Sequence, residues 1–227
     1  QLEINIALNI MRDICLGLVQ AHKLNPPLVH RDVKPHNILL EITGNKIEAK
    51  VSDFGVAKHL DPVTRVTEAA GTIAFMPPEV ISNYENTASD IYSAGIILYM
   101  MLTGVFPFII PKDYQTTTEE DIENLIKLTR TDSPKPPSNY NQDIPKELDK
   151  IALKALNPDI NHRYQDAEEF MKAIENYENA PLTAFMAGAD MILLCDQPSE
   201  IEKNFEEFKN EYYKQKISED RLKQSFE

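Results

Sequence analysis

The stretch LVHRDVKPHNILLEITGNKIEAKVSDFG, residues 28–55, decides the fold of this protein. It opens on a charged loop and continues into two short β-rich runs, NILLEI and AKVSDF, joined by the letters TGNK. Because Gly44 followed by Asn45 marks a turn, the two runs predict a small antiparallel hairpin. The second run ends in the letters DFG, which the hairpin leaves free to face the charged loop.

The charged residues of this stretch match the needs of phosphoryl transfer. That chemistry requires a carboxylate to accept the proton of the attacking hydroxyl, a cation beside the moving phosphoryl oxygens and oxygen ligands for Mg²⁺. Asp32, Lys34 and Asn37 lie on one loop, and Asp53 follows at the end of the hairpin. A generic charged turn can show one of these features, whereas both in this order and spacing indicate a phosphoryl-transfer site.

Three segments together resemble the C-terminal lobe of the eukaryotic-type protein kinases. The kinase signatures H-R-D-x-x-x-x-N, D-F-G and A-P-E correspond here to residues 30–37, 53–55 and 77–79. The segments SDIYSAGIILY and NPDINHRY extend the resemblance over about residues 1–178. It implies a mainly α-helical lobe with a small β hairpin, lacking the N-terminal lobe. It also implies transfer of the ATP γ-phosphate to protein Ser/Thr hydroxyls.

The resemblance assigns roles to individual residues of the site. Asp32 is similar to the catalytic base, and Lys34 to the cation that contacts the γ-phosphate. Asn37 and Asp53 are similar to the Mg²⁺ ligands, and Leu39 to the apolar floor beneath the adenine. The implied cofactors are therefore ATP and Mg²⁺, and the implied partner is a protein substrate.

A second group of residues is implied in regulation. In the family, an arginine at the position of Arg31 can pair with a phosphorylated residue of the activation segment. Thr64 and Thr67 are the candidates, and an ordinary Thr-containing loop is the alternative that remains open. Lys34, together with Thr72 after a glycine, resembles the Ser/Thr-specific branch of the family.

A third group is implied in holding the lobe together. Glu79 and Arg163 resemble the buried ion pair that anchors the activation segment, and Asp90 resembles the residue that braces the catalytic loop. Phe75 and Pro78 depart from the usual Tyr and Ala without removing a catalytic group. His30 is interpreted as a packed core histidine. The remaining histidines have no ligand spacing and are interpreted as incidental: His22, His36, His59 and His162.

Periodicity predicts the surrounding helices. Apolar residues at steps of three and four predict a helix over 1–23, and TTTEEDIENLIKLTR predicts one capped by Thr117 or Thr118. Two more helices follow a proline-rich connector. The apolar stretch 93–110 is interrupted by glycine and proline, and it predicts a buried core helix instead of a membrane span.

The expected activity of the chain by itself is low. No glycine-rich loop, strand lysine or partner glutamate precedes the first predicted helix, and in the family these parts cover and clamp the ATP phosphates. We expect these 227 residues to require the missing N-terminal lobe for phosphate transfer. A kinase lobe kept as a noncatalytic scaffold or binding module is the alternative that remains open.

From residue 179 onward the sequence pattern changes to one short strand followed by capped helices, so residues 179–227 are predicted to form a separate αβ tail. Over about 181–227 they resemble the end of the barrel domain in family 3 glycoside hydrolases of the β-N-acetylhexosaminidase type. That resemblance implies a glycoside hydrolase fragment as a second alternative, although the tail supplies no paired-carboxylate site by itself. An unrelated αβ appendage remains an open interpretation.

Composition bounds the remaining possibilities. The chain holds 36 acidic and 23 basic residues, a net charge of −13. This charge disfavours nonspecific binding to nucleic acid or anionic membranes, since both are polyanions. Cys15 and Cys195 have neither zinc nor disulfide spacing and are interpreted as free thiols in a reducing compartment. The predicted location is the cytoplasm.

Overall fold

The computed structural model describes residues 1–44, 46–54, 73–82, 84–109 and 118–179. The chain divides into two compact units, Gln1–Ile174 and Glu175–Glu227. The described part of the first unit is mostly helical, with one two-stranded antiparallel sheet. The strand and helices expected in the tail, over 180–227, lie outside the described residues.

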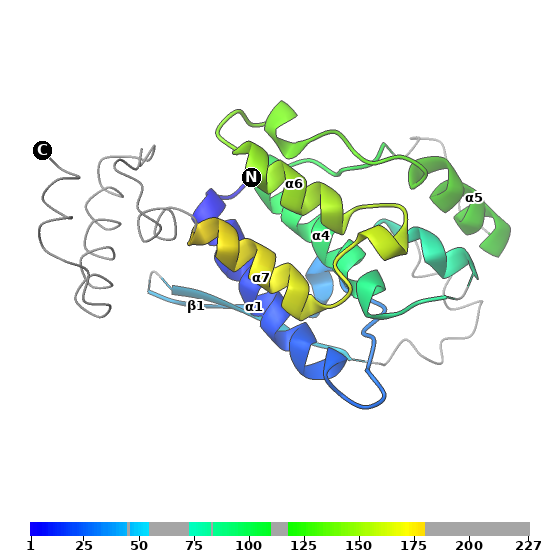
Figure 1. Cartoon of the computed structure of the whole chain (residues 1–227), viewed down its shortest axis with the longest axis horizontal. Helices are drawn as coiled ribbons and strands as arrows, with labels where there is room; N and C mark the ends of the chain where they lie inside the picture. The colour runs from blue at the N-terminus through cyan, green and yellow to red at the C-terminus, as the bar shows by residue number, and fades with distance from the viewer. Residues whose placement is uncertain (45, 55–72, 83, 110–117, 180–227) are drawn as a thin grey trace, which may run out of the picture. The chain divides into compact units, whose positions relative to one another are not determined.

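Two long helices form the centre of the first unit. α1 (Ile4–His22) buries one apolar face, and α4 (Thr87–Thr103) is buried on nearly all sides. α4 contacts both α1 and α6 (Lys146–Ala155), so these helices lie side by side (Figure 1). Gly95 lets α4 pack tightly against α6, because a Cβ at this position would come 2.8 Å from the Cβ of Ala155.

α4 is a buried core helix, as predicted for the stretch 93–110, but it begins earlier and ends at Thr103, because Gly104 terminates it. Asn86 and Ser89 form a capping box at its start, and Gly104 ends it with φ 76°. A left-handed residue of this kind costs glycine little and commonly terminates a helix. Among the described helices, α1 has the length and apolar composition of a membrane span, a property that it shares with many core helices. Half of α1 is buried in the protein.

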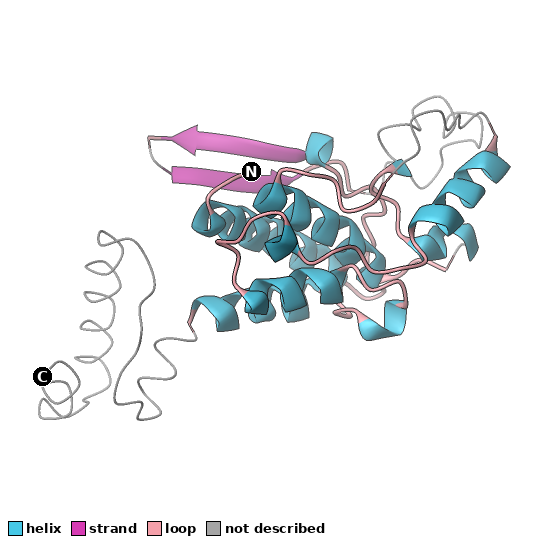
Figure 2. Cartoon of the chain, turned by 90° about the horizontal axis from the view of Figure 1, so that it is seen from above, coloured by secondary structure: helices cyan, strands magenta, loops and turns pink. Residues whose placement is uncertain are grey.

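The predicted hairpin is present and lies along one side of the helices (Figure 2). β1 (Ile38–Thr43) pairs with β2 (Lys46–Val51), and pairing extends to Thr43 opposite Lys46. The connection is therefore only two residues long, shorter than the TGNK predicted, since the flanking Thr and Lys join the ladder. The backbone N–H of Ala49 donates to the carboxylate of Asp13 on α1, which ties the hairpin to that helix.

The remaining helices follow the predicted periodicity. α5 (Glu119–Thr129) begins at a capping box of Thr118 and Asp121, and it contacts the 3₁₀ helix η3 (Pro78–Ser82). α7 (Ala167–Glu178) buries Phe170 and Ile174. Three short 3₁₀ turns complete the described elements: η1 (Pro35–Asn37), η4 (Pro137–Asn139) and η5 (Ile160–His162).

Candidate active site

The charged loop, residues 30–37, takes its conformation from Asp90. This carboxylate is 1% exposed in the first turn of α4. One oxygen accepts the backbone N–H of His30 at 2.7 Å, and the other accepts that of Arg31 at 2.8 Å. Arg31 has a positive φ of 69°, a conformation uncommon outside glycine that persists only where the surroundings hold it. Here the two hydrogen bonds to Asp90 stabilise this conformation of Arg31.

His22 joins the same carboxylate, and its interpretation as incidental is wrong. Its Nε2 lies 3.0 Å from Oδ2 of Asp90, and its Nδ1 accepts the backbone N–H of Ala167 at 3.2 Å. Because Nδ1 accepts a hydrogen bond, the proton of the neutral ring is on Nε2 and points to Asp90. The sequence held a usable signal: His22 follows Leu18 by four residues and therefore lies on the buried face of α1.

His30 connects the charged loop with the segment that follows β2. It is buried, as expected of a packed core histidine. Its Nε2 donates to the carbonyl of Ser52 at 2.8 Å, and its Nδ1 accepts the backbone N–H of Asp32 at 3.3 Å. The ring centroid is 4.7 Å from that of Phe54. The two halves of the predicted site therefore meet through this ring.

Lys34 and Asn37 both contact Asp32. The Nζ atom of Lys34 lies 2.8 Å from Oδ2 of Asp32, and the side-chain amide of Asn37 donates to the same oxygen at 3.0 Å. That amide also donates to the main-chain carbonyl of Asp32 at 2.8 Å. The side chains of Asp32 and Lys34 are 20% and 18% exposed. A carboxylate held in this way is fixed in position and still open to a hydroxyl from solution.

Asp53 lies next to this group. The hydroxyl of Ser52 is 3.1 Å from Oδ2 of Asp53 and 3.2 Å from the carbonyl oxygen of Asn37. Asp53 has a φ of 62°, so it is a second non-glycine residue of this site in the left-handed region. Backbone outliers of this kind concentrate where a side chain must be aimed.

The oxygens of Asn37 and Asp53 fit Mg²⁺ in their chemistry. Mg²⁺ is commonly bound by one or two protein oxygen ligands together with water and substrate phosphates, not by an all-protein cage. Among the described residues, no group of three or more His, Cys, Asp or Glu side chains could hold a metal by itself. The pair therefore suits a Mg²⁺ ion that arrives with a nucleotide.

Leu39 lies on the hairpin and is 57% exposed. It stands opposite Lys50 in the strand register. Leu40 and Ile42 on the same strand are exposed as well. An apolar strand that keeps this much surface in water is unusual unless something packs on it.

The residues predicted for regulation are only partly described. Arg31 places its Nε 3.9 Å from a carboxylate oxygen of Glu85. Its guanidinium is about one-third exposed, so this contact is a weak one. Thr64, Thr67 and Thr72 lie outside the described residues.

Glu79 and Arg163 form the ion pair that the resemblance implies. Two N–H groups of the guanidinium donate to the two carboxylate oxygens, at 2.7 and 2.8 Å. Ser89 donates to Glu79 at 2.7 Å, and Arg163 donates further to the carbonyl of Asn157 at 2.6 Å. The Arg163 side chain is fully buried and that of Glu79 is 9% exposed. The pair therefore connects η3 to the chain just after η5, far apart in sequence.

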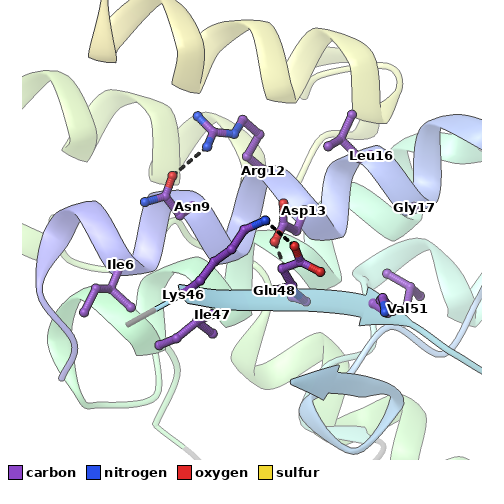
Figure 3. A pocket seen from close by; sticks show the side chains of 12 residues that line it. Ile6, Asn9, Arg12, Asp13, Leu16, Gly17, Lys46, Ile47, Glu48 and Val51 are labelled. Carbon is purple, nitrogen blue, oxygen red and sulfur yellow. Dashed lines mark hydrogen bonds and ion pairs between the residues drawn. The ribbon is translucent and has the colours of Figure 1, made fainter. Parts of the chain in front are cut away.

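A separate cleft of about 730 Å³ lies between α1 and β2 (Figure 3). It includes none of the residues predicted for the site. Its charged side chains are engaged: Lys46 pairs with Glu48, and Arg12 donates to Asn9 at 2.6 Å. The carboxylate of Asp13 bonds the backbone of β2, as described above.

The described residues thus include a braced loop on which Asp32 contacts Lys34 and Asn37, followed by a hairpin and Asp53. Residues 1–174 match the protein kinase domain, and the chain belongs to this family.

Its relatives carry serine/threonine kinase names. A probable serine/threonine-protein kinase of Clostridium perfringens is 35% identical over 78% of this chain and 24% of the relative. The serine/threonine-protein kinases PrkC of Bacillus subtilis and PknB of Mycobacterium leprae are 35% and 36% identical, each over 72% of this chain. The matched region is 24% of PrkC and 25% of PknB. The chain spans about a quarter of the length of the curated relatives that it matches.

Proposed function

We propose that residues 1–178 are the C-terminal lobe of a Ser/Thr protein kinase that transfers the γ-phosphate of ATP to protein hydroxyls. One observation carries the proposal. The carboxylate of Asp32 lies within 3.0 Å of both Lys34 and Asn37, on a loop held by Asp90. The serine/threonine kinase relatives support the same assignment.

The proposed roles follow from the contacts. Asp32 accepts the proton of the substrate hydroxyl and orients it, because its carboxylate is fixed and partly exposed. Lys34 supplies positive charge where negative charge gathers on the phosphoryl group, and a charge placed in advance needs no reorganisation during the reaction. Asn37 and Asp53 would hold Mg²⁺, which neutralises the phosphates when it is bound.

ATP binding calls for protein on both sides of the nucleotide. Leu39 offers an exposed apolar surface on this lobe, and we propose that it lies beneath the adenine. The glycine-rich loop and strand lysine of the family do not occur within these 227 residues, so we propose that an N-terminal lobe elsewhere in a longer protein completes the cleft. Since ATP and Mg²⁺ are its proposed cofactors, we place this lobe in the cytoplasm.

The test is phosphate transfer from labelled ATP to a generic Ser/Thr protein at saturating Mg²⁺, in the full-length protein. We expect Asp32→Asn to lower kcat by about 10²- to 10⁴-fold, the usual contribution of a positioned general base. Asp143→Asn, an exposed aspartate of the connector before α6, serves as the control and should leave kcat unchanged. Equal kcat in the Asp32→Asn variant and the parent would overturn the proposal.

Two further outcomes separate the alternatives. A full-length protein that neither binds nor hydrolyses ATP would favour the noncatalytic scaffold. Residues 1–227 tested alone should show little or no transfer, and robust turnover that Asp32→Asn abolishes would show that no second lobe is needed.

Regulation through Arg31 is also a proposal. Its guanidinium has a partly exposed position and only a weak contact with Glu85, so a phosphate could take it over with a stronger, charge-assisted contact. We expect the double variant Thr64→Ala, Thr67→Ala to lower activity of the full-length enzyme. Unchanged activity would contradict regulation by phosphorylation of these threonines.

The tail, residues 179–227, lies beyond the match to the kinase domain. We propose that it takes no part in phosphate transfer. Deleting residues 179–227 from the full-length protein should therefore leave phosphate transfer unchanged. Release of N-acetylglucosamine from a chromogenic glycoside by the full chain would revive the glycoside hydrolase interpretation.

A further inference from the structure

Arg130 is a buried cation without a carboxylate partner among the described residues. It is 2% exposed and caps the C-terminal end of α5. One guanidinium nitrogen donates to the carbonyl of Ala74 at 2.8 Å, and another donates to the hydroxyl of Thr129 at 2.9 Å. Its Nε is buried without a hydrogen-bond partner in the described part of the chain. Burying a charge in this way is costly, so a compensating role is expected.

Two aromatic rings make cation–π contacts with the guanidinium. The guanidinium carbon of Arg130 lies 4.1 Å from the centroid of the Phe108 ring and 5.7 Å from that of Phe106. A cation over a ring face is attracted by the ring, and more strongly when both are desolvated. The guanidinium is thereby fixed in orientation, with one nitrogen donating to the carbonyl of Ala74.

Arg130 and Arg163 each lie over one ring of a stacked aromatic pair. The guanidinium of Arg163 lies 4.6 Å from the ring of Tyr92, and Tyr92 stacks on Phe108 with centroids 6.0 Å apart and planes within 8°. The guanidinium of Arg130 lies over the same Phe108 ring. Two cations that are far apart in sequence are therefore joined through two parallel rings in the core.

The two arginines hold opposite ends of one short segment, Ala74–Glu79. Arg130 binds the carbonyl of Ala74, and Arg163 binds the carboxylate of Glu79. Between them, the hydroxyl of Ser93 donates to the carbonyl of Phe75 at 2.8 Å. This segment follows Thr72 and ends at the ion pair, so it is the last part of the proposed activation segment.

We propose that Arg130 is a positioning residue for the protein substrate, acting through the backbone of Ala74. The proposal rests on the proposed kinase function. In this proposal Arg130 holds Ala74–Glu79 in one conformation and the substrate chain contacts that segment, while Arg130 itself touches neither ATP nor the reacting atoms. Loss of Arg130 therefore weakens binding of the protein substrate and leaves binding of ATP unchanged.

The kinetic experiment compares Arg130→Met, Arg130→Lys and Lys127→Met in the full-length protein. Lys127 is the matched control, because it lies on the same helix in an exposed pair with Glu123. Arg130→Met removes the hydrogen bond that holds Ala74. If the bound conformation of this segment loses the support of one charge-assisted hydrogen bond, KM for the protein substrate should rise by about tenfold. KM for ATP should stay within about twofold of the parent value, because in this proposal Arg130 does not contribute to ATP binding.

Arg130→Lys keeps a cation and one donor, so it should recover part of the lost affinity, and Lys127→Met should match the parent. An unchanged KM for the protein substrate in Arg130→Met overturns the proposal, as does an equal rise in both KM values. If Arg130→Met does not fold, the same comparison is made with Arg130→Lys alone.

Amide hydrogen exchange over residues 73–76 of the full-length protein gives a readout without catalysis. The N–H of Met76 bonds the carbonyl of Ile73 in this turn, and we expect it to exchange faster in Arg130→Met than in Lys127→Met. Unchanged exchange overturns the anchor even if kinetics change. If the parent transfers no phosphate, the proposed function fails, and the exchange result alone decides whether Arg130 holds this segment.

Discussion

The Nε2 atom of His22 lies 3.0 Å from Oδ2 of Asp90, the carboxylate that binds the backbone N–H groups of His30 and Arg31. The other nitrogen of His22 accepts the N–H of Ala167 at the start of α7. A single buried imidazole therefore links α1, α4, α7 and the charged loop. The position of Asp32 depends on packing that begins far from the site.

Replacing His22 should destabilise the chain. His22→Ala leaves both the N–H of Ala167 and one side of Asp90 without a partner, and a buried polar group left unpaired costs about 1–3 kcal/mol. We expect the free energy of unfolding in urea to fall by about 2 kcal/mol or more on the same basis. His36→Ala, at an exposed histidine, is the control and should change it by less than about 0.5 kcal/mol. Equal values for both variants would mean that the His22 contacts are unimportant.

Breaking the buried ion pair should cost more than breaking an exposed one. Glu79→Gln leaves the guanidinium of Arg163 buried beside a neutral amide, and removing one partner of a buried pair costs about 3–5 kcal/mol. Glu48→Gln removes the exposed partner of Lys46 and should cost far less, because solvent screens an exposed pair. Urea unfolding of the two variants decides the point, and similar losses would contradict the assignment of Glu79 as an anchor.

Two buried tyrosines should respond in opposite ways to loss of the hydroxyl. The hydroxyl of Tyr92 has no hydrogen-bond partner among the described residues, whereas that of Tyr99 donates to the carbonyl of Lys135 at 2.8 Å. Burial raises the pKa of both side chains, so both hydroxyls are neutral. Tyr92→Phe should therefore leave stability unchanged or raise it, while Tyr99→Phe should lower it by about 1 kcal/mol. A thermal unfolding series distinguishes them, and a lower Tm for Tyr92→Phe would reveal a partner for that hydroxyl.

Acid should weaken the link between α1 and α7. Glu168 bonds Lys23 at 2.8 Å and Lys172 at 2.9 Å, and these hydrogen bonds lower its pKa to about 2. Because the folded pKa lies below the unfolded value of about 4.3, this contribution is complete above that pH and is lost as the pH falls toward 2. The difference in unfolding free energy between the parent and Glu168→Gln should therefore shrink from pH 5 to pH 2. A constant difference over that range would contradict the pKa shift.

The local elements were readable from the sequence because their causes are local. Turn residues, capping boxes and apolar spacing act within a few residues, so the hairpin, α1, α5 and the buried α4 were all predicted, with the hairpin turn two residues too long. The spacing of Asp32, Lys34 and Asn37 was equally readable, since the three share one loop. Their catalytic and metal-binding roles remain proposals.

What only the tertiary structure decided involves partners distant in the chain. His22 looked incidental because its partner Asp90 is 68 residues away. Arg130 gave no signal at all, since its hydrogen bond to Ala74 spans 56 residues and its stacking partners come from a third segment. By itself the sequence determined the elements and the chemistry of the loop, because short-range sterics and hydrogen bonding fix them. The tertiary structure decided which partners the buried charged groups have. Burying a charge is costly unless a partner compensates it, and those partners come from distant parts of the chain.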